Sequence, residues 1–209
     1  KTAYEIRLSL VGSEMCIRDR IYNTFLNSFH SFIDPPNEEE LLDAIDNAQL
    51  HENQEFGWTD GCNVMVERLS LEDINQSILG PSIAQYFDHV GQLSTLPTRP
   101  FSIKVNDVWR TTYKRGGFQE LHDHLPSDVS GVIFLDDDED DFAQFYFHHR
   151  HHSDWSEEWR SLFFPESRVY LRGEKGQVLF FPSHMMHGVT PHNSDKLRKT
   201  VAFNIKLQQ

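Results

Sequence analysis

The chain is poor in cysteine and has no long apolar segment. Its 209 residues include only two cysteines, Cys16 and Cys62, and these form no Cys-x-x-Cys pair. A disulfide-stabilised scaffold is therefore excluded, and the cysteine usage fits a reducing compartment. No run of residues reaches the roughly 18 apolar residues of a membrane-spanning helix. We expect a cytoplasmic protein that does not span a membrane.

Positive charge is also scarce. The chain has 19 Lys and Arg against 32 Asp and Glu, which gives a formal net charge of −13. Such a surface repels phosphates, so the composition disfavours nucleic acid as a partner. The densest acidic run is residues 136–141. It lacks the ligand spacing and central glycine of an EF-hand loop, and we interpret it as a solvated loop.

The sequence divides into three parts. Residues 1–20 look like a translated sequencing adapter, and we interpret them as a non-native leader without structural meaning. Residues 21–100 are predicted to form a helical support region. One helix should follow Asn37, which can cap it ahead of three glutamates. A second is expected over residues 71–90, with a break at Gly80 and Pro81.

Residues 101–209 change to a β pattern. Short runs rich in β-branched and aromatic residues alternate with glycine-containing turns. Helices followed by strands indicate an α+β fold that is mainly β, with a sandwich or barrel as its core. The predicted strands are residues 101–105, 109–114, 129–135, 142–147, 168–171, 177–181 and 199–207.

Two histidines in the β region share one strand face. His122 and His124 are two residues apart, and side chains at that spacing point to the same side of a strand. Two imidazoles on one face can hold one metal ion, whereas Asp123 would point away. The pattern alone is equally compatible with two surface histidines.

A third ligand could come from a later strand. An apolar run leads into Pro182, and His187 follows five residues later, at the start of another short strand. Three ligands on one side of a metal leave the opposite positions open, as in a facial triad. His184 is the rival ligand in this segment.

The last strand has one apolar and one polar face. Val201, Phe203 and Ile205 alternate with positions that share the opposite face, namely Arg198, Thr200, Ala202 and Asn204. An arginine with a hydroxyl two residues further on is suited to a carboxylate, because the guanidinium can bind both oxygens. A solvent-exposed strand face would show the same alternation.

The histidine-rich segment 148–152 has a metal-binding composition. Adjacent histidines alternate in direction along a strand, and Ser153, Asp154 and Trp155 follow as a loop or helix cap. We interpret the segment as an exposed loop.

Taken together, these motifs resemble the 2-oxoglutarate/Fe(II)-dependent oxygenases of marine phages and bacteria, in a His-x-His variant. The resemblance covers about residues 100–207. It rests on the order and spacing of Trp109, Tyr113, Gly116-Gly117, His122, His124, Ser130-Gly131-Val132, Phe181-Pro182-Ser183, His187, Arg198 and Ala202-Phe203-Asn204.

The resemblance implies a double-stranded β-helix (jelly-roll) core with the N-terminal helices packed on one sheet. It implies Fe(II) at His122, His124 and His187. It also implies 2-oxoglutarate held by Arg198 and Thr200, and dioxygen as co-substrate. Tyr113 and Asn204 are further candidates for the cofactor site. The implied reaction hydroxylates a small molecule or a protein side chain and releases succinate and CO2. A homodimer is compatible with this reading.

One departure from the wider superfamily leaves alternatives open. Its usual second ligand is Asp or Glu, and His124 stands at that position, so Asp128 or another metal such as zinc has to be considered. A cupin-type dioxygenase or isomerase would share the glycine and histidine spacing but would not need Arg198 and Thr200. A barrel that binds a ligand without catalysis is the third reading.

Overall fold

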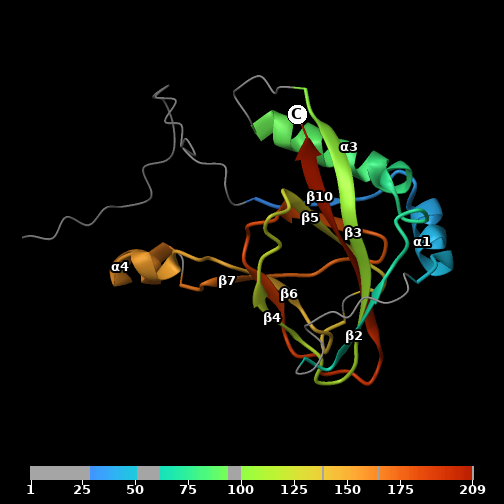
Figure 1. The fold of residues 1–209 in the computed structure, drawn as a ribbon. Helices are drawn as coiled ribbons and strands as arrows, with labels where there is room; N and C mark the ends of the chain where they lie inside the picture. Colours follow the sequence, from blue (N-terminus) through green and yellow to red (C-terminus); the bar gives the residue numbers. More distant parts are fainter. Residues whose placement is uncertain (1–28, 51–61, 94–99, 138, 164, 209) are drawn as a thin grey trace, which may run out of the picture.

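A computed structural model describes residues 29–50, 62–93, 100–137, 139–163 and 165–208 (Figure 1). The interpreted leader and Cys16 lie outside these residues. Two antiparallel sheets form the body, one of six strands and one of four. In the described part of the chain no helix is long and apolar enough to cross a membrane. The strand bounds are β1 Ser31–Ile33, β2 Val64–Arg68, β3 Ser102–Tyr113, β4 Gln119–His122, β5 Val129–Phe134, β6 Phe145–His148, β7 Arg168–Leu171, β8 Val178–Pro182, β9 His187–Val189 and β10 Arg198–Gln208.

The strand order is that of a double-stranded β-helix. The six-stranded sheet runs β1-β8-β5-β10-β3-β2, and the four-stranded sheet runs β4-β9-β6-β7. Along the chain, β3, β5, β8 and β10 lie in the larger sheet, whereas β4, β6, β7 and β9 lie in the smaller one. The apolar layer between the sheets includes Phe134, Phe145 and Phe181. The expected α+β, mainly β class and jelly-roll core are confirmed.

Two helices cover the outer face of the larger sheet, as Figure 1 shows for α1 and α3. Helix α1 is Glu38–Asn47 and α3 is Gln76–Leu93. Leu41 and Tyr86 from these helices are buried in one cluster with Phe180 and Phe203 from the sheet. The larger sheet is therefore packed on both faces, which explains why β5 and β8 are buried along their whole length.

Three expectations for residues 21–100 were wrong in detail. The region contains two strands, because β1 pairs with β8 and β2 pairs with β3. Helix α3 starts at Gln76 and continues through Pro81. Burial of its apolar face outweighs the roughly 3 kcal/mol that an interior proline costs. Asn37 precedes α1 but makes no side-chain cap; its amide donates to the Ile78 carbonyl and ties the two helices together.

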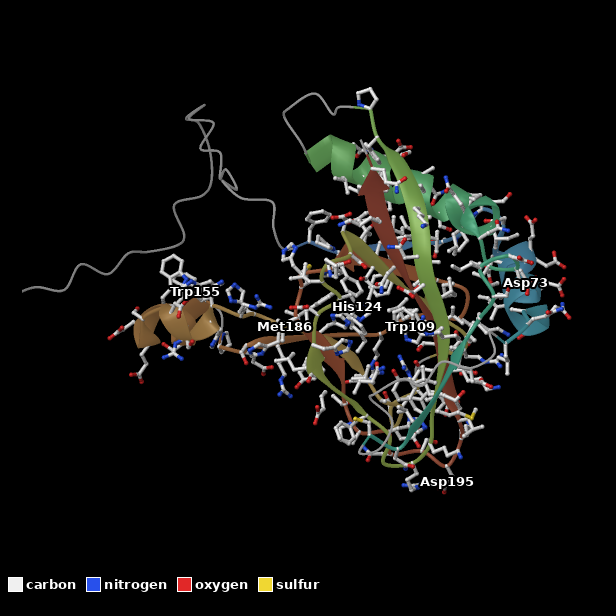
Figure 2. All side chains as sticks on the ribbon, in the orientation of Figure 1. Asp73, Trp109, His124, Trp155, Met186 and Asp195 are labelled. Atoms are coloured by element: carbon white, nitrogen blue, oxygen red, sulfur yellow. The ribbon has the colours of Figure 1, made fainter. Side chains whose placement is uncertain are left out.

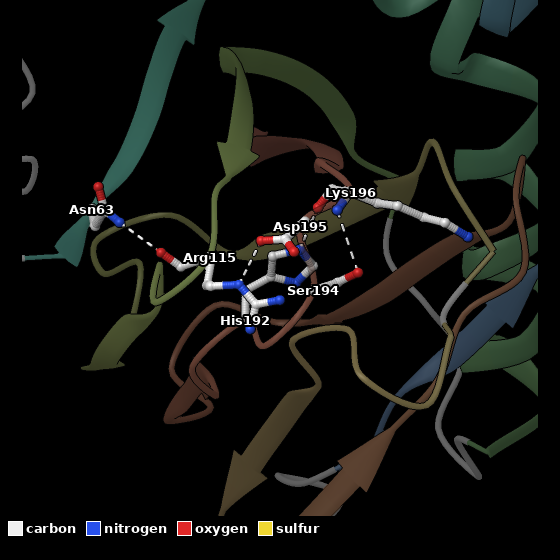
Figure 3. A network of polar contacts seen from close by, with 6 residues as sticks. All are labelled: Asn63, Arg115, His192, Ser194, Asp195 and Lys196. Carbon is white, nitrogen blue, oxygen red and sulfur yellow. Dashed lines mark hydrogen bonds and ion pairs between the residues drawn. The ribbon is translucent and has the colours of Figure 1, made fainter.

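A polar network closes one end of the barrel (Figure 3). Asn63 donates to the Arg115 carbonyl, and Arg115 forms an ion pair with Asp195 at 2.6 Å. The buried His192 ring accepts from the Ala143 amide and contacts the Lys196 carbonyl at 2.7 Å. These contacts join the loops between β3 and β4 and between β9 and β10. They fix the chain directly before Arg198.

Candidate metal and cofactor site

Three histidines from two neighbouring strands converge between the sheets. His122 ends β4 and His187 begins β9, and the two are direct partners in the antiparallel pairing. His124 follows two residues after β4, and its Nε2 lies 3.0 Å from that of His122. The three rings offer ligand atoms within 4.8 Å of one another, and this is the sole such group in the described residues.

Hydrogen bonds at Nδ1 fix the tautomers of His122 and His187. The Nδ1 atom of His122 lies 2.7 Å from the Glu120 carbonyl, and that of His187 lies 2.8 Å from the Met185 carbonyl. Each Nδ1 must therefore carry the proton and donate it, which leaves Nε2 with a lone pair.

His124 is oriented by a side chain. Its Nδ1 lies 2.8 Å from Oδ1 of Asn204, which also accepts a hydrogen bond from Ser130 Oγ at 2.9 Å. A carboxamide oxygen can only accept, so His124 has the same tautomer as the other two. The Nε2 atoms of His122 and His124 then face each other as two lone pairs at 3.0 Å. A divalent cation between them removes this repulsion, so the donor set fits a metal.

Burial keeps the cluster uncharged. Desolvation lowers the pKa of His122 to about 4, lowers the pKa of His124, and lowers that of the almost fully buried His187 well below its ordinary value. Neutral imidazoles are the form that binds metal. Three of them occupy one side of the ion and leave positions open for other ligands.

The low pKa values predict a pH-dependent stability for metal-free protein. Between about pH 6.5 and pH 4 the unfolded chain binds protons that buried His122 and His187 do not, so the free energy of unfolding falls as the pH falls. Each histidine contributes a slope of about 1.4 kcal/mol per pH unit. We expect the melting temperature of EDTA-treated protein to decrease from pH 6.5 to 4.5, and His122→Gln to make this decrease shallower. Equal slopes for both proteins would contradict the assignment.

Other sequence candidates lie away from the cluster. His184 is exposed, and Asp128 forms an ion pair with Lys206 and accepts from the Leu207 amide. Neither belongs to the convergent group. Of the segment expected to be an exposed loop, residues 149–151 are exposed in the turn after β6, whereas His148 ends β6 and is half-buried, as is His152. In the acidic run, Glu139 pairs with Lys196 and Asp140 with Arg172.

A cavity beside the histidines holds the one buried arginine of β10. Arg198 is 1% exposed, and its guanidinium lies 5.2 Å from the Tyr113 ring and 5.7 Å from the Phe134 ring. Thr200 lies two residues after Arg198 on β10 and lines the same cavity. The Tyr113 hydroxyl donates to Gln119 Oε1 at 2.7 Å. The free volume of this cavity is about 20 Å³, and its lining also includes all three histidines.

The four candidate cofactor residues therefore divide into two places. Arg198, Thr200 and Tyr113 line the cavity with the histidine cluster. Asn204 lies behind His124 instead, where it orients the ring. The alternation of β10 was predictable, but the contact of Asn204 with a residue 80 positions earlier had no signal in the sequence.

A groove opens on the other side of His122 and His124. Its lining includes the apolar side chains of Val66, Trp109 and Leu125, and its volume is about 280 Å³. The Trp109 ring lies 5.4 Å from the His124 ring, and Figure 2 shows the two labelled side by side between the sheets. An ion pair of Arg68 and Asp107 at 3.1 Å lies along the same groove. Sequence reasoning missed this groove, because one of its walls is the unpredicted strand β2.

Comparisons with known proteins agree with this geometry. Residues 107–204 match the family model described as "Putative 2OG-Fe(II) oxygenase". Among solved structures, the chain is similar to the non-heme alpha ketoglutarate dependent epimerase SnoN from nogalamycin biosynthesis, with a TM-score of 0.60 and 11% identity. This match covers 86% of this chain and 77% of the other. A comparison with curated proteins gave no match.

Two further solved structures share the fold. HygX from Streptomyces hygroscopicus, with nickel and 2-oxoglutarate bound, has a TM-score of 0.53 and 11% identity, over 86% of this chain and 83% of that one. The viral collagen prolyl hydroxylase of Paramecium Bursaria Chlorella virus-1, in a 2-oxoglutarate complex, has a TM-score of 0.50 and 12% identity, over 85% and 95%. At these identities the likeness establishes the fold.

Proposed function

We propose that the chain, of which residues 107–204 match the model of the 2OG-Fe(II) oxygenase family, is a 2-oxoglutarate/Fe(II)-dependent oxygenase that binds iron through His122, His124 and His187 and hydroxylates an organic substrate. The observation that carries the residue assignment is the convergence of the three imidazoles in one tautomeric state, with lone pairs facing one another at 3.0 Å for the first two. When bound, iron and 2-oxoglutarate supply the activation of dioxygen, with release of succinate and CO2.

Arg198 and Thr200 are proposed to hold the far carboxylate of 2-oxoglutarate. A guanidinium can bind both carboxylate oxygens, and in a buried site such bonds are strengthened by the low dielectric. The Tyr113 and Phe134 rings beside the guanidinium restrict its orientation and exclude water from it. These residues bind and orient the co-substrate, and no proton transfer is required of them.

A titration of the whole chain tests this proposal. Fe(II) is added anaerobically with and without 2-oxoglutarate, and the visible charge-transfer absorption of the chelated metal is followed. We expect an absorption band that requires both additions, and release of succinate after oxygen is admitted. Metal binding without any response to 2-oxoglutarate would favour a cupin-type enzyme, and absence of metal binding would favour a non-catalytic barrel.

The groove beside His122 is proposed as the substrate site. Its volume of about 280 Å³ is close to the lower end of the roughly 300–1,000 Å³ typical of small-molecule pockets. Its lining combines apolar side chains with the charged residues Arg68, Asp107 and Asp123, which suits a small molecule or a single protein side chain. The net charge of −13 argues against nucleic acid as the substrate.

Blocking the groove should remove substrate stimulation of 2-oxoglutarate turnover. Val66 points into the groove from β2, whereas its neighbour Met65 is 46% exposed on the opposite face. We expect Val66→Trp to reduce the stimulation by any compound found in a succinate-release screen at least tenfold. Met65→Trp should retain the stimulation. Equal responses of the two variants would place the substrate elsewhere.

A further inference from the structure

An arm projects from the four-stranded sheet. We define the arm as residues 155–163 and 165–171, which include helix α4 at Glu157–Phe163 and strand β7. Figure 1 shows α4 at the outer end of this arm, away from both sheets, and Figure 2 shows Trp155 there. Helix α4 has no buried residue. Its apolar side chains are exposed, with 51% for Trp159, 73% for Leu162 and 59% for Phe163.

A helix of this kind requires a packing partner. Isolated helices shorter than about 12 residues are marginal in water, and most of the stability of protein helices comes from a packed apolar face. Helix α4 has only 7 residues, and its large apolar side chains meet solvent. An exposed cluster of this type marks an interaction surface.

Strand β7 offers a second, independent feature. It is the edge of the four-stranded sheet and pairs with β6 over all four of its residues without a bulge. Val169 is 57% and Tyr170 is 43% exposed. The strand contains one charged residue, Arg168, and no proline, the residues that commonly protect an edge against pairing. No strand of the described residues pairs with its outer edge, which can therefore accept another strand.

We propose that a second copy of this chain covers the arm, with the two β7 strands antiparallel across a two-fold axis and each α4 packed against the partner arm. An isologous contact of this type pairs one surface with itself. The arm carries three acidic residues, Glu157, Glu158 and Glu166, and two basic residues, Arg160 and Arg168. Its net charge is thus −1 out of a total of −13, so the charge repulsion between two copies at this surface is small.

The available area fits a modest homodimer. A whole aromatic side chain offers about 150–250 Å², so each half-exposed ring of the arm contributes roughly 100 Å². Three such rings and two aliphatic side chains of similar exposure from each of two copies give on the order of 1,000 Å², the lower bound of a specific interface. The contributors are Trp159, Leu162, Phe163, Val169 and Tyr170. Because buried area does not fix the affinity, the dissociation constant has to be measured.

Sedimentation of the full chain from 1 to 100 μM tests the proposal. We expect a concentration-dependent dimer, and an increase of at least 100-fold in the dissociation constant for Leu162→Asp/Phe163→Asp. The matched control is Leu197→Asp, which changes a side chain that is 47% exposed in the loop before β10 and should leave the dimer intact. Circular dichroism of each variant verifies folding. A wild type that stays monomeric at 100 μM, or a dimer that survives the double substitution, would overturn the proposal.

Hydrogen exchange gives a readout that needs no variant. Backbone amides of residues 168–171 should exchange more slowly at 100 μM than at 1 μM, because the strand edge is paired only in the dimer. Exchange that is independent of concentration would show that β7 does not form the interface. The inference stands apart from the oxygenase activity, since both measurements are made without metal or 2-oxoglutarate.

Discussion

Replacement of His187 by alanine is expected to lower the affinity for Fe(II) by more than 100-fold and to abolish 2-oxoglutarate turnover. Loss of a residue that merely orients a ligand already costs 10- to 100-fold in metal affinity, so loss of a ligand should cost more. The buried His187 is the partner of His122 across β4 and β9, and no other described His, Cys, Asp or Glu belongs to the group. The measurement is a metal titration, with succinate release as the second readout.

His184→Ala is the matched control for this substitution. Both variants remove one imidazole from the same segment, but His184 is exposed and lies outside the cluster. We expect His184→Ala to bind metal as the wild type does. If the two variants lost metal to the same degree, or if His187→Ala kept it, the three-histidine assignment would be wrong.

Arg198→Ala is expected to weaken 2-oxoglutarate binding by roughly 30- to 4,000-fold while metal binding persists. Truncation of one partner of a buried, hydrogen-bonded charge pair costs roughly 2–5 kcal/mol, and each 1.4 kcal/mol is a factor of ten. Arg198 is 1% exposed, in the cavity that also reaches the histidines. The affinity is obtained by titrating 2-oxoglutarate into protein loaded with Fe(II) under nitrogen.

Two companions make the Arg198 experiment specific. Arg198→Lys keeps the charge but loses the planar fork, so its affinity should lie between those of the wild type and Arg198→Ala. Lys199→Ala removes an exposed cation from the adjacent position and should have no effect. An unchanged affinity in Arg198→Ala would mean that a different group binds the far carboxylate.

The sequence predicted those features that depend on local periodicity. The alternation in β10 placed Val201, Phe203 and Ile205 in the outer core, as the structure confirms. It also placed Arg198 and Thr200 on the inward face. The spacing of His122 and His124 predicted two rings with a common direction, and their Nε2 atoms do meet. In β10 the strand period of two carries the information, whereas His124 lies after the end of β4 and meets His122 from the following loop.

Features that depend on pairing between segments far apart in the sequence were not predictable. Strands β1 and β2 are short, and they exist because β8 and β3 offer open edges more than 40 residues later in the chain. The helix break expected at Pro81 followed from local propensity, which tertiary packing overrides. Likewise, the β2 wall of the groove beside His122 and the contact of Asn204 with His124 arise only after the sheet has formed.

Because β10 is one continuous strand, the site depends on the number of residues between its members as well as on their type. Arg198 and Asn204 lie six residues apart on one strand, about 20 Å along it, with β3 and β5 paired on either side. An insertion or deletion of one residue between them would turn the arginine or the asparagine towards the outer core. Natural variation and protein engineering in this segment are therefore restricted to exchanges that keep its length, whereas the loop before Arg198 can absorb a change.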